Sequence, residues 1–517
     1  MRLAALDLGS NSFHLIVVEA KADGSFETLL REREMLRLGD VVARDGLIPP
    51  EACDRAVASV ARLHALAQAM DVDETVACAT SAIREAENGS VLVDRIEAET
   101  GVQVRVISGK DEARLIFAAV RSSVVLDPAP ALCLDLGGGS LEIMVGDSAG
   151  LLWSTSLKLG VGRLSAELAR SDPPSTGDVR RLRKRLLAAL RPVADQIADL
   201  EPRMLVVSSG TLVSLVRMAV AAKRGEVPAS VNQLRVRAKE LTALHRRLTA
   251  STSAERARLP GLEGRRADQL PAGSTLLQAV VELFGLTDVT VSSWALREGM
   301  VLEAIGRHDP VDWSADPRAM RRASVLSLCR RCNWDEAHAR QVARLATDLF
   351  DQTLRAHRLE ARDRELLEYG ALLHDIGEHV AADGHEHHGA YIIEHGRLRG
   401  FDPDEVRMLS VLARFHRRGT PKASFPAFAA LDEAGQDRAA RLVALLRVAD
   451  GLDRGRGGSI EGLDAVITSD EVILTLDANV DLDLELWGLR RNRDLFERLF
   501  GRGLEVASPV AELARGA

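Results

Sequence analysis

Cysteine is scarce in this chain of 517 residues, which has five, at positions 53, 78, 133, 329 and 332. So small and odd a number argues against a disulfide framework and favours reduced thiols in the cytoplasm. Cys329 and Cys332 form a CxxC motif, but no second cysteine pair completes a zinc site, and the spacing lies in a helical pattern. We therefore interpret these two cysteines as half-buried positions of one helix.

The sequence also lacks an excess of basic residues and any long apolar run. Its net charge is −8, which excludes the global positive field that nucleic-acid-binding proteins carry. No apolar run reaches the ~18 residues that a membrane span needs, and the N-terminus enters a strand pattern without the features of a signal peptide. We expect a cytoplasmic protein that contacts neither a membrane nor a nucleic-acid polymer. An anionic substrate would need local basic patches.

The length, at roughly 100–200 residues per domain, predicts about three or four domains. Strand and helix patterns alternate over residues 1–125 and again over 126–305, which predicts two related α/β lobes. The stretch "IGRHDPVDWSADPRAM", which contains two prolines among acidic residues, indicates a boundary near 305–320.

The rest of the chain has a different character. Apolar residues recur at helical spacing through 320–455, as in "DEAHARQVARLATDLFDQTL", which predicts an all-α domain. The segment "RGRGGS" at 454–459 is typical of a linker. Residues 459–507 then predict a small α+β unit, with a hairpin in "DAVITSDEVILTLD" and a helix that closes it.

Two short polar loops share one pattern. "DLGSNS" at 7–12 follows one apolar strand, and "DLGGGS" at 135–140 follows another. Glycines let a ligand approach the backbone, and converging N–H groups can bind an anion. An acid before each loop fits a Mg²⁺ ion that bridges the acid and a phosphate. Two ordinary hairpin turns are the alternative, but one such loop at the start of each lobe favours a phosphate site between the lobes.

The chain resembles the exopolyphosphatase and guanosine pentaphosphate phosphatase family, within the superfamily of actin, sugar kinases and heat-shock ATPases. The matching strings occur in the order of the family. They are "DLGSNSFHL", "ATSAIREAENG", "ISGKDEARLIF", "LDLGGGSLEI", "SSGT" and "LREGM". The resemblance implies two actin-like, ribonuclease H-like lobes, then the HD-like helical domain and small tail of the long form of the family. It also implies a homodimer.

The resemblance assigns residues in the lobes. It implies Glu112 as the base that activates water, and a carboxylate near a polyanion should have a raised pKa that suits this role. It implies Asp135 and Glu142, together with Asp7, as ligands of Mg²⁺ or another divalent cation. The implied phosphate-binding residues are Ser10, Asn11, Ser12, Arg84, Gly137, Gly138, Gly139 and Ser140.

Two further segments resemble parts of the superfamily. "SSGT" at 208–211 lies where its kinases hold adenosine, but it is short of glycines, which weakens the case for an ATP-binding kinase. "ALREGM", with Arg297 and Glu298, is expected to pack the second lobe together.

The helical region carries a second set of candidate residues. The order His338, His374-Asp375, Asp450 is the metal signature of HD-type phosphohydrolases, and it predicts an additional divalent metal in the HD-like domain. Four further histidines of this region, His385, His387, His388 and His416, are candidates for a second ion or for phosphate contacts. The alternative is a relic of the fold, in which His and Asp satisfy each other, because this domain is often degenerate in the family.

The sequence therefore predicts a Mg²⁺-dependent exopolyphosphatase, which releases orthophosphate from the end of inorganic polyphosphate. Removal of the 5′ γ-phosphate from guanosine pentaphosphate is an alternative, because both substrates present a terminal phosphoanhydride. A kinase, a non-catalytic sensor of polyphosphate or an alarmone, and a nucleotide hydrolase in the HD-like domain are weaker alternatives.

Overall fold

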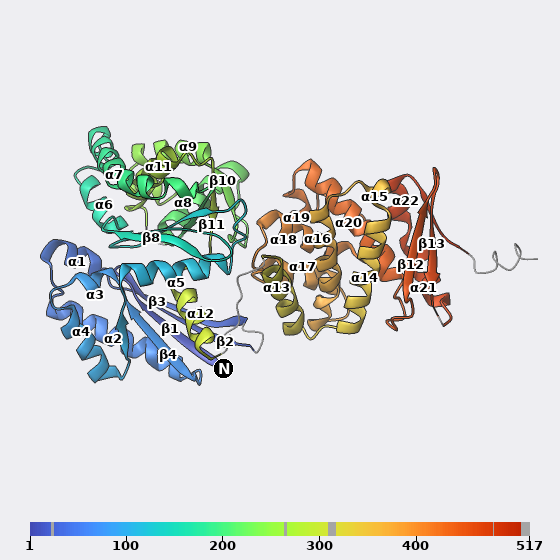
Figure 1. The fold of residues 1–517 in the computed structure, drawn as a ribbon, viewed down its shortest axis with the longest axis horizontal. Coiled ribbons are helices and arrows are strands. Elements are labelled where there is room, and N and C mark those ends of the chain that lie inside the picture. Colours follow the sequence, from blue (N-terminus) through green and yellow to red (C-terminus); the bar gives the residue numbers. More distant parts are fainter. Residues whose placement is uncertain (22–24, 263–265, 309–316, 479, 508–517) are drawn as a thin grey trace, which may run out of the picture. The chain divides into compact units, whose positions relative to one another are not determined.

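The computed structural model describes residues 1–21, 25–262, 266–308, 317–478 and 480–507. The chain divides into two compact units, Met1–Met320 and Arg321–Ala517 (Figure 1). The division falls at the end of the boundary predicted for 305–320, of which residues 309–316 lie outside the described residues. The finer division into four domains stays a prediction.

A five-stranded sheet of order β3-β2-β1-β4-β5 forms the first lobe. Its strands are β1 (Arg2–Leu8), β2 (Ser12–Ala20), β3 (Phe26–Met35), β4 (Glu74–Ala79) and β5 (Val104–Val106). The helices of this part of the sequence are α1 (Leu38–Asp45), α2 (Pro50–Gln68), α3 (Ser81–Glu85), α4 (Gly89–Thr100) and α5 (Gly109–Arg121). Successive side chains of β1 point to opposite faces of the sheet, so Leu6 and Ala5 join two different hydrophobic clusters.

A six-stranded sheet of order β10-β11-β9-β6-β7-β8 forms the second lobe. Its strands are β6 (Ala131–Leu136), β7 (Leu141–Gly146), β8 (Leu151–Leu157), β9 (Met204–Ser208), β10 (Arg235–Arg237) and β11 (Asp288–Val291). The helices that follow or connect them are α6 (Val161–Leu168), α7 (Thr176–Gln196), the 3₁₀ helix η1 (Ala198–Leu200), α8 (Gly210–Arg224), α9 (Ala238–Ala250), α10 (Ser253–Arg256), α11 (Leu270–Phe284) and α12 (Leu296–His308).

The two sheets repeat one topology. In the first, β1 pairs antiparallel with β2 and parallel with β4. In the second, β6 pairs antiparallel with β7 and parallel with β9. This repetition confirms the prediction of two related α/β lobes, and it places the two polar loops at equivalent turns.

Helices α5 and α12 share one hydrophobic cluster with both sheets, and Figure 1 shows α5 between the lobes. The cluster contains Leu3 of β1, Leu115 of α5, Cys133 of β6 and Met300 of α12. The sequence predicts that α12 packs the second lobe together, but this helix packs on α5 and β1 instead. The reason is that a helical pattern reveals an apolar face without revealing which sheet covers it.

The second unit is mainly helical. Its helices, of which α13 begins before the division, are α13 (Pro317–Arg331), α14 (Glu336–Gln352), α15 (Leu354–His357), α16 (Ala361–Leu373), the 3₁₀ helix η2 (Ile376–His379), α17 (His385–His395), α18 (Pro403–Phe415), α19 (Pro426–Ala429), α20 (Glu433–Gly451), α21 (Asp483–Asn492) and α22 (Asp494–Phe500). Its strands are β12 (Gly462–Ile467), β13 (Glu471–Asp477) and β14 (Gly503–Val506).

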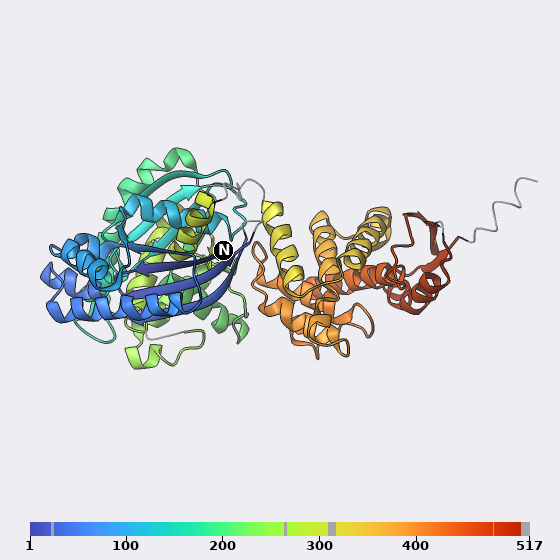
Figure 2. The same ribbon diagram turned by 90° about the horizontal axis from the view of Figure 1, so that it is seen from below.

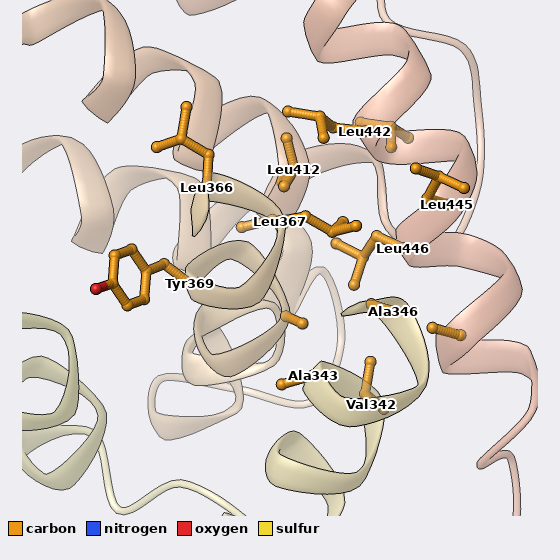
Figure 3. Packing of buried hydrophobic residues seen from close by; sticks show 14 of the residues in the cluster. Val342, Ala343, Ala346, Leu366, Leu367, Tyr369, Leu412, Leu442, Leu445 and Leu446 are labelled. Carbon is orange, nitrogen blue, oxygen red and sulfur yellow. The ribbon is translucent and has the colours of Figure 1, made fainter. Parts of the chain in front are cut away.

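The core of the second unit lies between α14, α16, α18 and α20. Figure 3 shows Val342, Leu367, Leu412 and Leu446, one from each of these helices, pointing toward one another. Cys329 on α13 and Cys332, which directly follows this helix, belong to the same core and are buried, where the sequence predicts half-buried positions of one helix. Burial raises the pKa of the Cys329 thiol above its usual range, so a reactive role has no support.

The predicted hairpin forms, with β12 antiparallel to β13, and β14 adds parallel to β13. Figures 1 and 2 both show this small sheet at one end of the second unit. Leu474 of the sheet and Phe496 of α22 lie in the same hydrophobic cluster as the helical core. The sheet is therefore attached to the helices through apolar packing as well as through the chain.

Candidate functional site

The two polar loops and the acids before them occupy equivalent places in the two sheets. Asp7 stands opposite His14 in the register of β1 and β2, and Asp135 stands opposite Glu142 in the register of β6 and β7. Each loop thus follows a strand that ends one residue after its acid. The repeated backbone carries different side chains, since the second lobe pairs an acid with an acid and the first pairs an acid with a histidine.

The loops approach each other closely. A Cβ atom on Gly138 would lie 2.6 Å from Oδ1 of Asn11, so a larger residue there would force the Asn11 side chain to move. The backbone N–H of Ala82 donates to Oγ of Ser10 at 3.1 Å, which ties the first loop to the start of α3.

A pocket of about 420 Å³ opens at this contact between the loops. The predicted residues that line it are Asp7, Ser10, Asn11, Ser12, Glu112, Asp135, Gly137, Gly138 and Ser140. The structure therefore brings most of the predicted cleft residues together. Gly139, Glu142 and Arg84 lie behind this lining, where each contacts a residue of the loops or of α5.

The carboxylates of Asp7 and Asp135 line the pocket, and the buried carboxylate of Glu142 lies near that of Asp135. Oγ of Ser208 donates to Asp135 at 2.5 Å, and Oγ of Ser156 donates to Glu142 at 2.8 Å. No described residue donates a hydrogen bond to Oδ1 of Asp7 or to Oε2 of Glu142, although both atoms are buried. A buried carboxylate oxygen without a donor is costly unless a cation or a proton neutralises the carboxylate.

The pKa values show that these carboxylates are crowded and buried. Burial raises the pKa of Asp7 to about 7, with the charge of Asp135 adding to the shift and Arg297 opposing it. Burial raises the pKa of Asp135 to about 6, and burial with the charge of Glu112 raises that of Glu142. Hard oxygen ligands crowded in this way fit Mg²⁺ or a similar divalent cation.

Glu112 is positioned by the start of α5. Oγ of Ser108 caps this helix by accepting from the N–H of Asp111 at 3.1 Å, and it donates to the carboxylate of Asp111 at 2.6 Å. Asp111 is therefore part of the cap and exposed, whereas Glu112 is buried and faces the pocket. Burial raises the pKa of Glu112 to about 7, although Arg84 opposes the shift.

Arg84 contacts the protein instead of the pocket. Its Nη1 donates to Oε2 of Glu112 at 3.1 Å and to the carbonyl oxygen of Ile107 at 2.6 Å. The sequence predicts a guanidinium that binds phosphate directly. The structure gives this group a carboxylate partner, and pairing of this kind holds the carboxylate in one orientation.

Sequence reasoning missed the role of His14 and Arg297. Nη1 of Arg297 lies 3.2 Å from Nδ1 of His14, and Nε2 of the same ring lies 2.7 Å from Oγ of Ser12. Burial and the neighbouring arginines lower the pKa of His14 to about 2, so the ring is neutral. A guanidinium only donates, so Nδ1 of His14 accepts from Arg297 and the hydrogen of the neutral ring lies on Nε2. Nε2 therefore donates to Oγ of Ser12, whose own hydroxyl hydrogen can then point to a ligand. The string "LREGM" was the available signal for Arg297.

The second unit brings its four predicted metal ligands together. Nε2 of His338 and Nε2 of His374 lie 3.6 Å and 3.7 Å from Oδ1 of Asp450. Nε2 of His374 lies 3.5 Å from Oδ2 of Asp375. The cap of α14 places His338, because Asp335 accepts from the N–H of His338 at 3.1 Å. His374 and Asp375 follow directly after α16.

Solved structures share the arrangement of the two lobes. An exopolyphosphatase from Cytophaga hutchinsonii has a TM-score of 0.56 and 30% identity, covering 59% of this chain and 98% of its own. A Ppx/GppA protein family member from Aquifex aeolicus has a TM-score of 0.51 and 26% identity, covering 60% and 99%. Among curated proteins, Exopolyphosphatase 1 of Mycobacterium leprae is 35% identical over 327 residues, which are 63% of this chain and 94% of that relative. The lobes have the actin-like fold of these relatives, which indicate a phosphoanhydride hydrolase.

The Ppx/GppA phosphatase family matches residues 17–308, and domain III of these phosphatases matches residues 320–493. The chain belongs to the Ppx/GppA phosphatase family. About three fifths of this chain matches nearly the full length of each of these relatives. This chain therefore contains residues that have no counterpart in them. Within the described part of the chain, no helix is both long and apolar enough to cross a membrane.

Proposed function

We propose that the pocket between the loops hydrolyses the terminal phosphoanhydride of inorganic polyphosphate and releases orthophosphate. The observation that carries this proposal is the buried Glu112, which faces a pocket lined by both polar loops. Family membership supports the reaction class, and the similarity to exopolyphosphatases supports the substrate.

Glu112 is the general base in this proposal. It takes a proton from a water molecule whose oxygen forms a bond to the terminal phosphorus. The bond between that phosphorus and the bridging oxygen breaks, so the shortened polyphosphate leaves with the electron pair. A pKa near 7 suits a base that works at neutral pH. Arg84 holds the carboxylate toward the pocket through its hydrogen bond.

Asp7, Asp135 and Glu142 would hold Mg²⁺ or another divalent cation. Such a cation supplies charge neutralisation at the terminal phosphate when it is bound. Ser10, Asn11 and Ser12 of the first loop and residues 137–140 of the second would hold phosphate oxygens. The orphaned oxygens of Asp7 and Glu142 are the observation that supports this assignment.

The arginines of the pocket favour a polyanion. Arg33, Arg266 and Arg297 line it, and their positive charges all reach His14. A Cβ on Gly210 would lie 2.3 Å from the guanidinium carbon of Arg266, so a charged group occupies the segment where kinases of the superfamily hold adenosine. Positive charge there suits the next phosphates of a chain better than it suits an adenine ring.

The test is release of orthophosphate by the purified full chain. Long polyphosphate, guanosine pentaphosphate and ATP are compared at equal concentration, each with Mg²⁺ and each with a chelator. We expect polyphosphate to be the best substrate and the chelator to abolish its hydrolysis. A higher kcat/KM for guanosine pentaphosphate would make that nucleotide the proposed substrate in place of polyphosphate. No orthophosphate release from any of the three would contradict hydrolysis and favour a protein that only binds its ligand.

We also propose that the second unit contains an HD-like domain over 320–455, followed by the α+β unit over 459–507. Its divalent metal would be held by His338, His374, Asp375 and Asp450. The clustering of His338, His374 and Asp450, whose ligand atoms all lie within 4.8 Å of one another, supports this site.

A further inference from the structure

The backbone of the second polar loop is held by the start of α6. The carbonyl oxygens of residues 137–139 accept hydrogen bonds from the N–H groups of residues 160–162, at distances between 2.9 and 3.1 Å. A Cβ atom on Gly160 would lie 2.2 Å from the carbonyl carbon of Gly139, so the two segments are in close contact. All three of these carbonyl groups therefore face the start of α6.

This arrangement sets the direction of the N–H groups in the loop. The peptide bonds that follow residues 137–139 are trans, and the C=O and N–H groups of a trans peptide point in opposite directions. Because the carbonyl groups face the start of α6, the N–H groups of residues 138–140 point away from it. Gly138 and Ser140 both line the pocket, and N–H groups that share a direction in this way can bind an anion.

The first polar loop is held in the same manner. The carbonyl oxygen of Ser10 accepts from the N–H of Gly39 at 2.8 Å, and that of Asn11 accepts from the N–H of Arg37 at 2.8 Å. Gly39 belongs to α1, and Arg37 comes directly before this helix. Each loop is thus hydrogen-bonded to the beginning of a helix of its own lobe. The second loop has one further contact, which comes from a side chain.

The side chain of Arg163 connects the second loop to the first lobe. Its Nε donates to the carbonyl oxygen of Gly139 at 3.2 Å, and its Nη2 donates to Oε2 of Glu85 at 2.8 Å. Glu85 ends α3 in the first lobe, where Oγ of Ser81 donates to its other carboxylate oxygen at 2.7 Å. A Cβ atom on Gly139 would lie 2.4 Å from the same Oγ of Ser81. Helix α3 therefore meets the second loop directly and also holds it through Arg163.

Glu85 pairs with a second cation, which offers a comparison. Nζ of Lys158 lies 3.1 Å from Oε2 of Glu85, but the Lys158 side chain is 73% exposed, against 26% for Arg163. Within the described part of the chain, Lys158 donates no hydrogen bond to the loop. An exposed ion pair contributes little to stability. The contact that links Glu85 to the loop is therefore the one through Arg163.

We propose that Glu85 and Arg163 are positioning residues for phosphate binding. Glu85 of the first lobe holds Arg163, and Arg163 holds the peptide between Gly139 and Ser140 so that the N–H of Ser140 faces the terminal phosphate. This inference rests on the proposed function, since it takes the pocket to be the site of that phosphate. A guanidinium that donates to a carbonyl group polarises the peptide, which strengthens its N–H as a donor. The loop of one lobe is thus set by a carboxylate of the other.

The first test measures binding of orthophosphate to the full chain by equilibrium dialysis with Mg²⁺, which needs no turnover. Arg163→Met keeps an apolar stem and removes both hydrogen bonds, so the Kd should rise about tenfold, the effect of losing one charge-assisted hydrogen bond. Lys158→Gln is the matched control, because it removes a positive charge from the same carboxylate without touching the loop, and it should leave the Kd unchanged. Equal effects of the two variants would assign the binding to charge alone and overturn the inference.

The second test compares the hydrolysis of tripolyphosphate with that of long polyphosphate. Since the loop holds only the terminal phosphate, Arg163→Met should lower kcat/KM by the same factor for both substrates. Glu85→Gln keeps the shape of its side chain and should lower kcat/KM by a smaller factor, and it gives this readout even if Arg163→Met fails to fold. It should add nothing to Arg163→Met, because Glu85 acts through Arg163. A loss that grows with chain length, or additive effects of the two variants, overturns the inference.

The two tests separate this inference from the proposed function. If the chain hydrolyses polyphosphate and Arg163→Met binds orthophosphate as tightly as the parent chain, the positioning role is wrong and the proposed function stands. If the chain does not hydrolyse polyphosphate and Arg163→Met binds orthophosphate about tenfold more weakly, the proposed function is wrong and the positioning of a phosphate by Arg163 stands.

Discussion

The guanidinium of Arg84 holds Glu112 through a hydrogen bond of 3.1 Å between Nη1 and Oε2. A carboxylate that is buried against a pocket and fixed by a cation has a defined direction and a tunable proton affinity. Arg84 therefore acts through Glu112 in the proposed mechanism and is a positioning residue.

Replacing Glu112 by glutamine tests the base directly. Glutamine keeps the shape and still accepts from Arg84, but it cannot take a proton. We expect kcat for polyphosphate to fall by about 10²–10⁴-fold, the usual contribution of a general base. Asp111→Asn is the matched control, because Asp111 is its exposed neighbour on the same helix. An unchanged kcat for Glu112→Gln would mean that another group activates water.

The pH profile should report the same carboxylate. A base works in its deprotonated form, and Glu112 has a pKa of about 7, so kcat/KM should rise with pH up to about 7 and level off above it. Arg84 lowers that pKa, so Arg84→Ala should move the rising limb to higher pH. Initial rates from pH 5 to 9 at constant ionic strength measure this. If the rising part of the profile does not move in Arg84→Ala, Arg84 does not influence the group that titrates.

Arg297 should contribute to substrate binding. It lines the pocket and orients Ser12 through His14, so Arg297→Gln should raise KM for long polyphosphate about tenfold with a smaller effect on kcat. Steady-state kinetics at fixed Mg²⁺ measure both constants. Arg95→Gln, which removes the ion pairs of this α4 residue with Asp54 of α2 and Glu99 of α4 and does not touch the pocket, is the control and should change neither. Equal effects of the two variants would indicate a general loss of positive charge.

Two glycines of α12 should respond in opposite directions to alanine. A Cβ on Gly299 would lie 2.0 Å from the carbonyl oxygen of Leu115 on α5, so Gly299→Ala should destabilise the first unit by about 1–3 kcal/mol. Gly306 has open space around it, so Gly306→Ala should stabilise the helix by up to about 1 kcal/mol. Denaturant midpoints measure both. A stabilising Gly299→Ala would show that α12 does not pack closely on α5.

Local patterns predicted a large part of this structure. The hairpins around "DLGSNS" and "DLGGGS" were predictable because each consists of apolar strand patterns on either side of a polar turn. The partner of Arg84 was not, because the pairing with Glu112 depends on how α3 and α5 meet in space. The sequence named His385, His387, His388 and His416 as equal candidates, and only the turns of α17 and α18 separate the buried pair from the exposed His387.

The packing of α12 on β1 joins the last helix of the first unit to its first strand. Leu3 of β1 and Met300 of α12 share one cluster. Synthesis of the chain proceeds from the N-terminus, so the core of the first lobe stays incomplete until residues 296–308 have left the ribosome. The lobe that is made first is therefore finished last, and the pocket forms only when both lobes are present.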